Sequence, residues 1–455
     1  MLCLNLIAEL SGLVDVDGSD ILVCNLCQEA QLQFATDADI RGSISRLERY
    51  KATESKGDLA LWQQAIGLNY LEHGMLTDKS LEDIVFPASQ YCHDWMHCIF
   101  AGGIFNVVIF LCLMAAKEEA TNVWEILHGY TLKFTWPKAA KFCPDKNDNL
   151  SKARVKAHVK AKLFKCTASD GLSLLPVVAL FVQCVLKLIP GINLAALDAF
   201  ILLADVIDVL CAVPLGVVTA ACLRDRIRAF LQACEAAGWR PHFIPKFHWL
   251  IHLANALERW GILPTCWVHE RKHKVVKRYA DDIHNTKTYS TSVMSEAISH
   301  QLCEVCEASA FDLSPGLVNP STAKAKARTF VLRSLELPAG PEAAVMTSTA
   351  VRLTTGALCC KTDAILIRAN DDVNFVAGQL WLLFSVEDLA VALVSLWDFE
   401  SYDRHQGKAI WRMVDRPALL NFDDILCSVI WSETSPGIAV TLVPYQYRGL
   451  EAIVE

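Results

Sequence analysis

Apolar residues are distributed in two different patterns along this chain. Two long segments, residues 97–116 and 172–223, are almost continuously apolar, which is typical of helices buried in a protein core. After Pro315 the pattern changes to short alternating or β-branched runs separated by turn residues, as expected of strands. The sequence therefore predicts an α+β fold that is mostly helical and ends in a small β-rich C-terminal domain.

Shorter stretches complete the predicted order of elements. Helices are expected at residues 40–50 and 59–72, after Pro245, and again after Pro264. Residues 314–325 are expected to form a linker. Strands are predicted at residues 345–355, 364–368, 375–383, 390–397 and 425–431.

Hydrophobic residues make up 53% of the chain, so a membrane protein has to be considered. Residues 97–116 are nearly uncharged and long enough to span a bilayer. Charges are costly inside a membrane, however, and the second apolar segment is interrupted by Lys187, Asp198, Asp205 and Asp208. We therefore expect packed helices rather than membrane insertion; a multi-pass membrane protein is the less favoured alternative.

Charge and cysteine content narrow the function classes. The formal net charge of −8 gives no overall attraction to nucleic acid, so DNA contact requires a local basic surface. The 18 cysteines are scattered through apolar segments, which favours reduced, buried thiols in an intracellular protein. The N-terminus also has no basic segment of the signal-peptide type. Cys24 and Cys27 form a CxxC pair whose spacing suits half of a zinc site or a redox pair.

Two further pairs of residues have the spacing of metal ligands on one helical face. Asp94 and His97 are three residues apart, and His248 and His252 are four residues apart. Each pair also has a simpler interpretation. Asp94 would be a helix cap beside an ordinary histidine, and His248 and His252 would be two surface histidines. Spacing alone leaves both interpretations open.

Glu270 lies within a strongly basic stretch. The cations that follow it are Arg271, Lys272, Lys274, Lys277 and Arg278. One interpretation is a solvated basic helix with a compensating carboxylate. The other is a metal-binding carboxylate on a surface whose lysines and arginines contact DNA phosphates.

The order of these motifs resembles that of the CACTA (En/Spm-like) transposases, members of the CMC superfamily of DDE transposases. The chain carries Asp-x-x-His, a long helical segment, Lys-x-His-x-x-x-His and then Cys-Trp-x-x-Glu-x-Lys-His, which begins at Cys266, over about residues 20–310. The residues matched to the family motifs are, in this order, Asp94, His97, Lys246, His248, His252 and the final catalytic glutamate, Glu270.

The resemblance implies an RNase H-like core that is interrupted by a large helical insertion. It further implies a nuclear protein that binds DNA (transposon ends or DNA in general), uses Mg²⁺ for strand transfer and forms a homo-oligomer. The corresponding division is residues 1–93 for the remnant of the core with its CxxC pair, 94–245 for the insertion, 246–312 for the helical end of the core, and 320–455 for the β-rich domain.

A further resemblance, to the related antigen-receptor recombinase, implies zinc. In that interpretation two distant pairs join as one Zn²⁺ site that fixes the ends of the insertion beside Glu270. The expected ligands are Asp94, His97, His248 and His252.

The first and second catalytic aspartates of the family are not identifiable in this sequence, which indicates a chain that is N-terminally truncated relative to its relatives. A single Glu270 cannot assemble a two-metal site by itself. We therefore expect a transposable-element-derived protein that is catalytically incomplete. The principal alternative is a domesticated, non-catalytic DNA-binding or scaffold protein.

Overall fold

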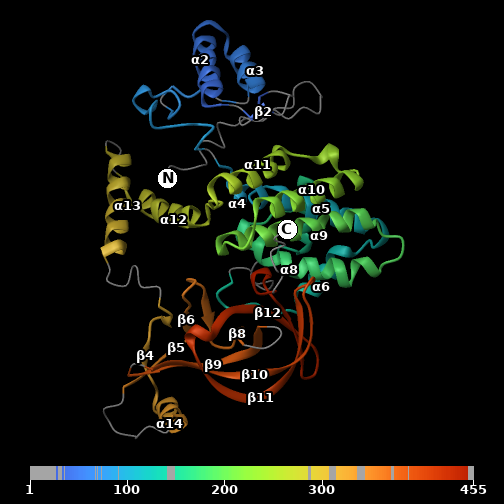
Figure 1. The fold of residues 1–455 in the computed structure, drawn as a ribbon, viewed down its shortest axis with the longest axis vertical. Helices are drawn as coiled ribbons and strands as arrows, with labels where there is room; N and C mark the ends of the chain where they lie inside the picture. The colour runs from blue at the N-terminus through green and yellow to red at the C-terminus, as the bar shows by residue number, and fades with distance from the viewer. Residues whose placement is uncertain are drawn as a thin grey trace.

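The computed structural model shows a helical body against which a β-rich domain packs, with smaller helical elements extending from the body (Figure 1). Residues 27–28, 33–34, 64–66 and 268–275 are described by their backbone alone. The residues that the structure describes are 27–28, 33–34, 36–66, 68, 70–72, 74–90, 92–140, 149–284, 288–306, 314–335, 344–369, 374–387 and 389–448.

The N-terminal part contains a small strand pair and two helices. Its elements are β1 (Cys27–Gln28), β2 (Gln33–Phe34), α2 (Asp37–Thr53), α3 (Lys56–Ile66) and the 3-10 helix η2 (Lys79–Leu81). A capping box fixes the start of α2, because the Thr36 side chain accepts from the Asp39 backbone N–H while the Asp39 side chain accepts from the Thr36 N–H. Leu47 of α2 is fully buried in the small core of this part.

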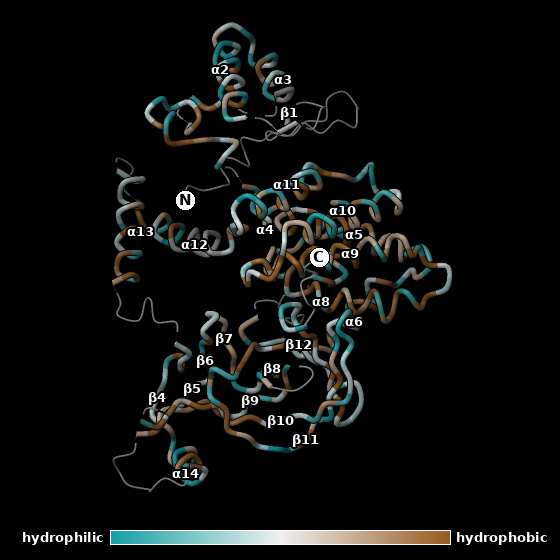
Figure 2. The backbone as a smooth tube through the Cα atoms, viewed as in Figure 1, coloured by the Kyte–Doolittle hydropathy of each residue, from teal (hydrophilic) through white to brown (hydrophobic). Residues whose placement is uncertain are grey.

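The helical body is built from the two apolar segments and the residues around them. Helix α9 lies in its middle, in contact with α5, α8 and α10, and Figure 2 shows apolar residues along all of the central helices. The elements are α4 (Trp95–Ile99), α5 (Ile104–Glu119), α6 (Val123–Thr131), α7 (Lys152–Ala161), α8 (Ala168–Cys184), η3 (Leu186–Leu188), α9 (Leu194–Ala212), η4 (Val213–Leu215), α10 (Ala220–Ala236), η5 (Arg240–His242) and α11 (Pro245–Trp260).

The first apolar segment is divided at a pair of glycines. Gly102 adopts a positive φ of 59°, and a Cβ on Gly103 would lie 2.3 Å from the Cys98 carbonyl oxygen. Two segments, Trp95–Glu119 and Ala168–Leu188, are apolar and long enough to cross a membrane. Within the protein, 72% and 50% of their most apolar windows are buried, respectively.

Two helices continue from the helical body and extend away from it (Figure 1). These are α12 (Trp267–Asp282) and α13 (Tyr289–Cys306), which contact each other. The predicted polar helix after Pro264 therefore consists of two helices.

The C-terminal domain is dominated by antiparallel strands. The strands β9, β10, β11, β13, β12 and β8 pair in this order, and β8 pairs again with β9, so the sheet closes into a barrel. The elements are β3 (Gly316–Leu317), β4 (Ser321–Thr322), α14 (Ala325–Ser334), β5 (Val345–Ser348), β6 (Ala350–Arg352), β7 (Leu358–Cys360), β8 (Ala364–Arg368), β9 (Phe375–Val386), β10 (Leu389–Asp403), β11 (Lys408–Asn421), η6 (Phe422–Asp424), β12 (Ile425–Ser435), β13 (Ile438–Leu442) and η7 (Tyr445–Tyr447).

Strand β8 shows how this domain is packed. Its alternate residues enter two different hydrophobic clusters, with Leu366 in the cluster that contains Trp397 and Trp411, and Ile365 in another. Both of these tryptophans are almost fully buried and therefore serve as core residues.

The helical body and the barrel share an interface with apolar and polar contacts. Phe134 and Leu180 pack against Leu442 of β13. The backbones of Thr135 and Trp431 exchange two hydrogen bonds, of 2.7 and 3.1 Å. Additional polar contacts are the 3.2 Å ion pair of Arg448 with Asp208 and the 3.0 Å hydrogen bond from the Lys138 backbone N–H to Asp363.

The structure confirms an α+β protein with a helical region followed by a β-rich region. It differs from the sequence prediction in several places, and helix α14 and strand β7 were not predicted. Residues 316–317 and 321–322 of the expected linker pair with β6 and β5, respectively. Strands β11 and β13 were not expected and complete the barrel.

Candidate functional site

Asp94, in the Asp-x-x-His motif, contacts Cys266, which begins the last of the sequence motifs. It is the N-cap of α4, where its carboxylate accepts from the backbone N–H groups of Met96 (3.2 Å) and His97 (3.1 Å). The same carboxylate accepts a 3.0 Å hydrogen bond from the backbone N–H of Cys266, which is the N-cap residue of α12. Asp94 thus connects the first turns of two helices that are far apart in sequence.

The surroundings of Asp94 determine its charge. Burial opposes the negative charge, because the side chain is only 4% exposed. The interactions with the His97 ring and the backbone N–H groups outweigh this effect and lower the pKa of the Asp94 carboxyl below its ordinary value. Asp94 is therefore ionised at neutral pH.

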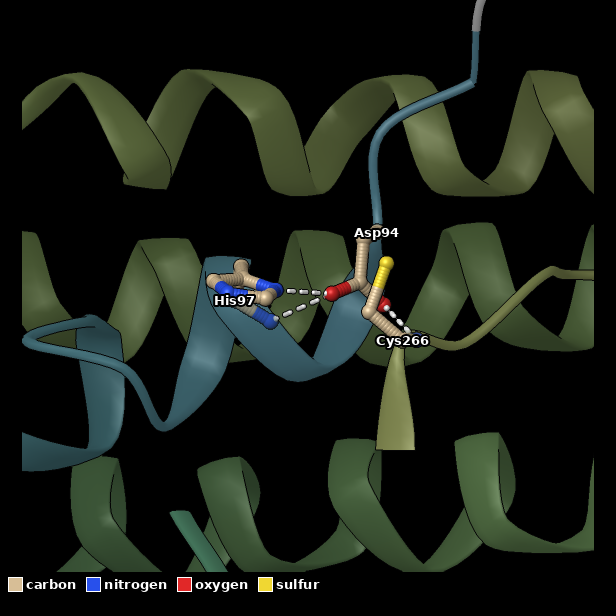
Figure 3. Close-up of side chains that lie close together, drawn as sticks. All are labelled: Asp94, His97 and Cys266. Atoms are coloured by element: carbon tan, nitrogen blue, oxygen red, sulfur yellow. Dashed lines mark hydrogen bonds and ion pairs between the residues drawn. The ribbon is translucent and has the colours of Figure 1, made fainter. Parts of the chain in front are cut away.

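His97 and Cys266 complete a group of three candidate ligands around this carboxylate (Figure 3). The ligand atoms of Asp94, His97 and Cys266 all lie within 4.8 Å of one another. His97 Nδ1 contacts Asp94 Oδ2 directly. The carboxylate lies between the imidazole and the thiol (Figure 3), whereas a nucleophilic Cys–His–Asp triad requires the imidazole in the middle. The order of the three side chains therefore differs from that of a Cys–His–Asp triad.

Lys246 holds α11 against the end of α4. Its ammonium group donates to the carbonyl oxygens of His97 (3.0 Å) and Ala101 (2.7 Å), and its own carbonyl oxygen accepts from the Cys98 thiol at 3.2 Å. Burial lowers the pKa of Lys246, and the nearby Cys98 and Asp94 partly oppose this effect. The lysine of the Lys-x-His-x-x-x-His motif thus has a structural role, since it joins α11 to the end of α4.

The two histidines of α11 form a second group, together with His93. His248 Nε2 and His252 Nε2 are 3.1 Å apart. The His93 ring stacks on Trp249 at 4.9 Å and on His252 at 5.7 Å between ring centroids. Burial, and then the nearby His252 and His248, lower the pKa of His93 well below its ordinary value, so this ring is neutral at pH 7.

The four predicted zinc ligands are therefore divided between two groups. Asp94 and His97 lie with Cys266, whereas His248 and His252 face each other beside His93. Among the described side chains, the group around Asp94 is the one with three donors within 4.8 Å of one another. Sequence spacing did not identify Cys266 or His93 as site residues. Neither has the spacing of a partner on the same helical face, and only the tertiary fold brings them to these two groups.

The remaining predicted site residues belong to α12 or to the N-terminal CxxC pair. Trp267 packs in the first turn of α12 against Trp95 and Phe100, with ring centroids 6.3 and 6.2 Å apart. Lys277 and Arg278 are exposed. The side chains of Glu270, Arg271, Lys272 and Lys274 lie outside the described part of the chain, as do Cys24 and the side chain of Cys27.

The described donors around Asp94 do not fit the Mg²⁺ expected from the transposase resemblance. Magnesium binds oxygen ligands in octahedral geometry, whereas the neighbours of Asp94 offer an imidazole and a thiol.

Comparison of the chain with protein-family models, curated proteins and solved structures finds no match.

Proposed function

We propose that the chain is a transposable-element-derived DNA-binding protein that descends from a CACTA-type DDE transposase and lacks strand-transfer activity of its own. In this proposal residues 94–245 correspond to the insertion of an RNase H-like core, and residues 246–312, which include α11 and α12, correspond to the helical end of that core. The protein would act in the nucleus.

One observation carries the proposal. The three motifs that resemble the family, at residues 94–97, 246–252 and 266–273, lie far apart in sequence, and Asp94 and Cys266 are 172 residues apart. Lys246 contacts the end of α4, and Cys266 contacts Asp94 at its start. Their convergence supports a common origin as parts of one site, because unrelated chance matches have no reason to meet.

The DNA-binding part of the proposal rests on α12. This helix extends away from the helical body (Figure 1), and its exposed Lys277 and Arg278 belong to a run of five cations in a chain of net charge −8. The exposed cations of this projecting helix support the proposal, because phosphate contacts require a local basic surface.

Salt-dependent binding of the full chain to duplex DNA tests this part. We expect log Kd to depend linearly on log salt, with a slope that falls by about 1–2 in Lys277→Ala/Arg278→Ala, since each phosphate contact contributes about 0.9. The control variant Lys56→Ala/Lys79→Ala removes two exposed cations from the N-terminal part and is expected to keep the wild-type slope. Binding that both variants weaken equally, or no salt-dependent binding, would contradict the proposal.

The absence of catalysis is tested separately. A two-metal site needs clustered carboxylates, and the described neighbours of Asp94 offer nitrogen and sulfur instead. We expect no Mg²⁺- or Mn²⁺-dependent nicking or strand transfer on terminal-repeat DNA. Activity that is present in the wild-type chain and lost in Glu270→Gln would establish an active transposase.

A further inference from the structure

We infer that Asp94, His97 and Cys266 bind one zinc ion that joins the start of α4 to the start of α12. This site differs from the four-ligand set expected from sequence, because it takes Cys266 as a ligand and leaves His248 and His252 out. The inference is independent of DNA binding, since it concerns only these three donors and the two helix ends that carry them.

The three donor atoms lie close enough together that small side-chain movements would bring them into coordination around one zinc ion. All three ligand atoms lie within 4.8 Å of one another. In tetrahedral zinc sites, bonds of about 2.0–2.3 Å place neighbouring ligand atoms roughly 3.4–3.6 Å apart. His97 Nδ1 and Asp94 Oδ2 are in direct contact in the structure, so binding of zinc through both atoms requires a side-chain rotation that separates them.

The donor chemistry selects zinc among the common cations. A thiolate and an imidazole are ligands that zinc accepts readily, whereas Mg²⁺ and Ca²⁺ require a shell of oxygen atoms. Three protein ligands leave a fourth position, and the partly exposed His97 ring, at 24%, places that position next to solvent. Water is therefore the expected fourth ligand.

The location of the site gives the metal a structural role. Asp94 is the N-cap of α4, His97 lies in the first turn of this helix, and Cys266 is the N-cap of α12. The Cys266 backbone already donates to Asp94, and Trp267 packs on aromatic residues of α4 and its end. Zinc would add a strong bond at this junction and fix the direction in which α12 leaves the helical body.

The first measurement is the metal content of the purified full chain after loading with ZnCl₂ and removal of excess metal. We expect Cys266→Ala and His97→Ala each to hold one zinc equivalent fewer than wild type. The control Cys303→Ala removes an exposed thiol on α13 and is expected to keep the full content. Loss of zinc in His248→Ala/His252→Ala together with full retention in Cys266→Ala would assign the metal to the α11 histidines and overturn the inference.

Cobalt separates a ligand role from a failure to fold. Loading of the wild-type chain with CoCl₂ should give a thiolate-to-cobalt charge-transfer band and the visible bands of a tetrahedral ion. Cys266→His keeps a metal ligand, so it should retain the visible bands while its charge-transfer intensity falls by the contribution of one thiolate. Unchanged charge-transfer intensity in Cys266→His, or no metal bound by the wild-type chain, would refute the site.

Discussion

Replacement of Lys246 by methionine tests whether this motif residue holds α11 on α4. Methionine preserves the unbranched apolar stem and removes only the ammonium donor. The substitution leaves the carbonyl oxygens of His97 and Ala101 without the hydrogen bonds of 3.0 and 2.7 Å that Lys246 supplies. We expect the helical body to lose stability.

The size of the expected stability loss depends on two opposing effects, the hydrogen bonds that Lys246 makes and the cost of desolvating its ammonium group. A hydrogen bond to a charged group contributes about 1.5–3 kcal/mol, so two of them contribute roughly 3–6 kcal/mol before costs. The half-buried ammonium also pays for desolvation, as the lowered pKa of Lys246 indicates. We therefore expect a net loss of about 2 kcal/mol in the free energy of unfolding.

Urea unfolding followed by the helical circular dichroism signal provides the assay. With a denaturant slope of about 2 kcal/mol per molar, the midpoint should fall by roughly 1 M. The control Lys187→Met removes a lysine whose 2.7 Å pair with Asp198 is solvent-exposed, and it should shift stability by less than about 0.5 kcal/mol. Equal midpoints for Lys246→Met and Lys187→Met would refute the reasoning.

Three other substitutions probe the packing, the domain interface and the barrel. Gly171→Ala should cost about 1–3 kcal/mol in urea unfolding, because the new Cβ would lie 2.8 Å from the Phe100 ring; an unchanged midpoint would show that the ring moves freely. Burial raises the pKa of Asp208 from 3.8 to about 6, so the folded state holds this proton more tightly and stability falls as pH rises from about 4 to 6. Between pH 4.5 and 7, the free energy of unfolding of Asp208→Asn should therefore fall by about 1–3 kcal/mol less than that of the wild type, as measured by urea unfolding at both pH values. Equal losses in the two proteins would contradict this expectation. Thr441→Val removes the 2.8 Å acceptor of the fully buried Trp411 indole N–H and should lower stability by about 1–3 kcal/mol, whereas an unaltered melting temperature would indicate another partner.

The sequence predicted the elements whose residue pattern alone determines their structure. The apolar segments became α5, α8 and α9 because continuous apolar residues must be covered on all sides. Strand β11 was not predicted, since its second half is mostly exposed and contains Arg416 and Pro417. Pairing with β10 and β13 stabilises this strand, and such pairing partners are not visible in local sequence.

The candidate site was predictable only where its residues share a helix. The spacing of Asp94 with His97, and of His248 with His252, correctly indicated side chains that meet on one face. The joining of the two pairs was inferred from a resemblance, and the structure instead places Cys266 beside Asp94. That contact depends on the path of the chain from α11 to α12, which follows from tertiary packing.

The structural roles of the motif residues change how functional experiments on this protein must be interpreted. Asp94 caps α4 and Lys246 fastens α11 to it, so changes at either residue weaken the fold whether or not the chain binds DNA. Loss of DNA binding in such variants therefore has two explanations, a lost DNA contact or a weakened fold. Lys277 and Arg278 are exposed on a projecting helix, and their replacement by alanine removes charge without opening a cavity. The comparison of these two cations with Lys56 and Lys79 therefore separates DNA recognition from folding, which the motif residues themselves cannot do.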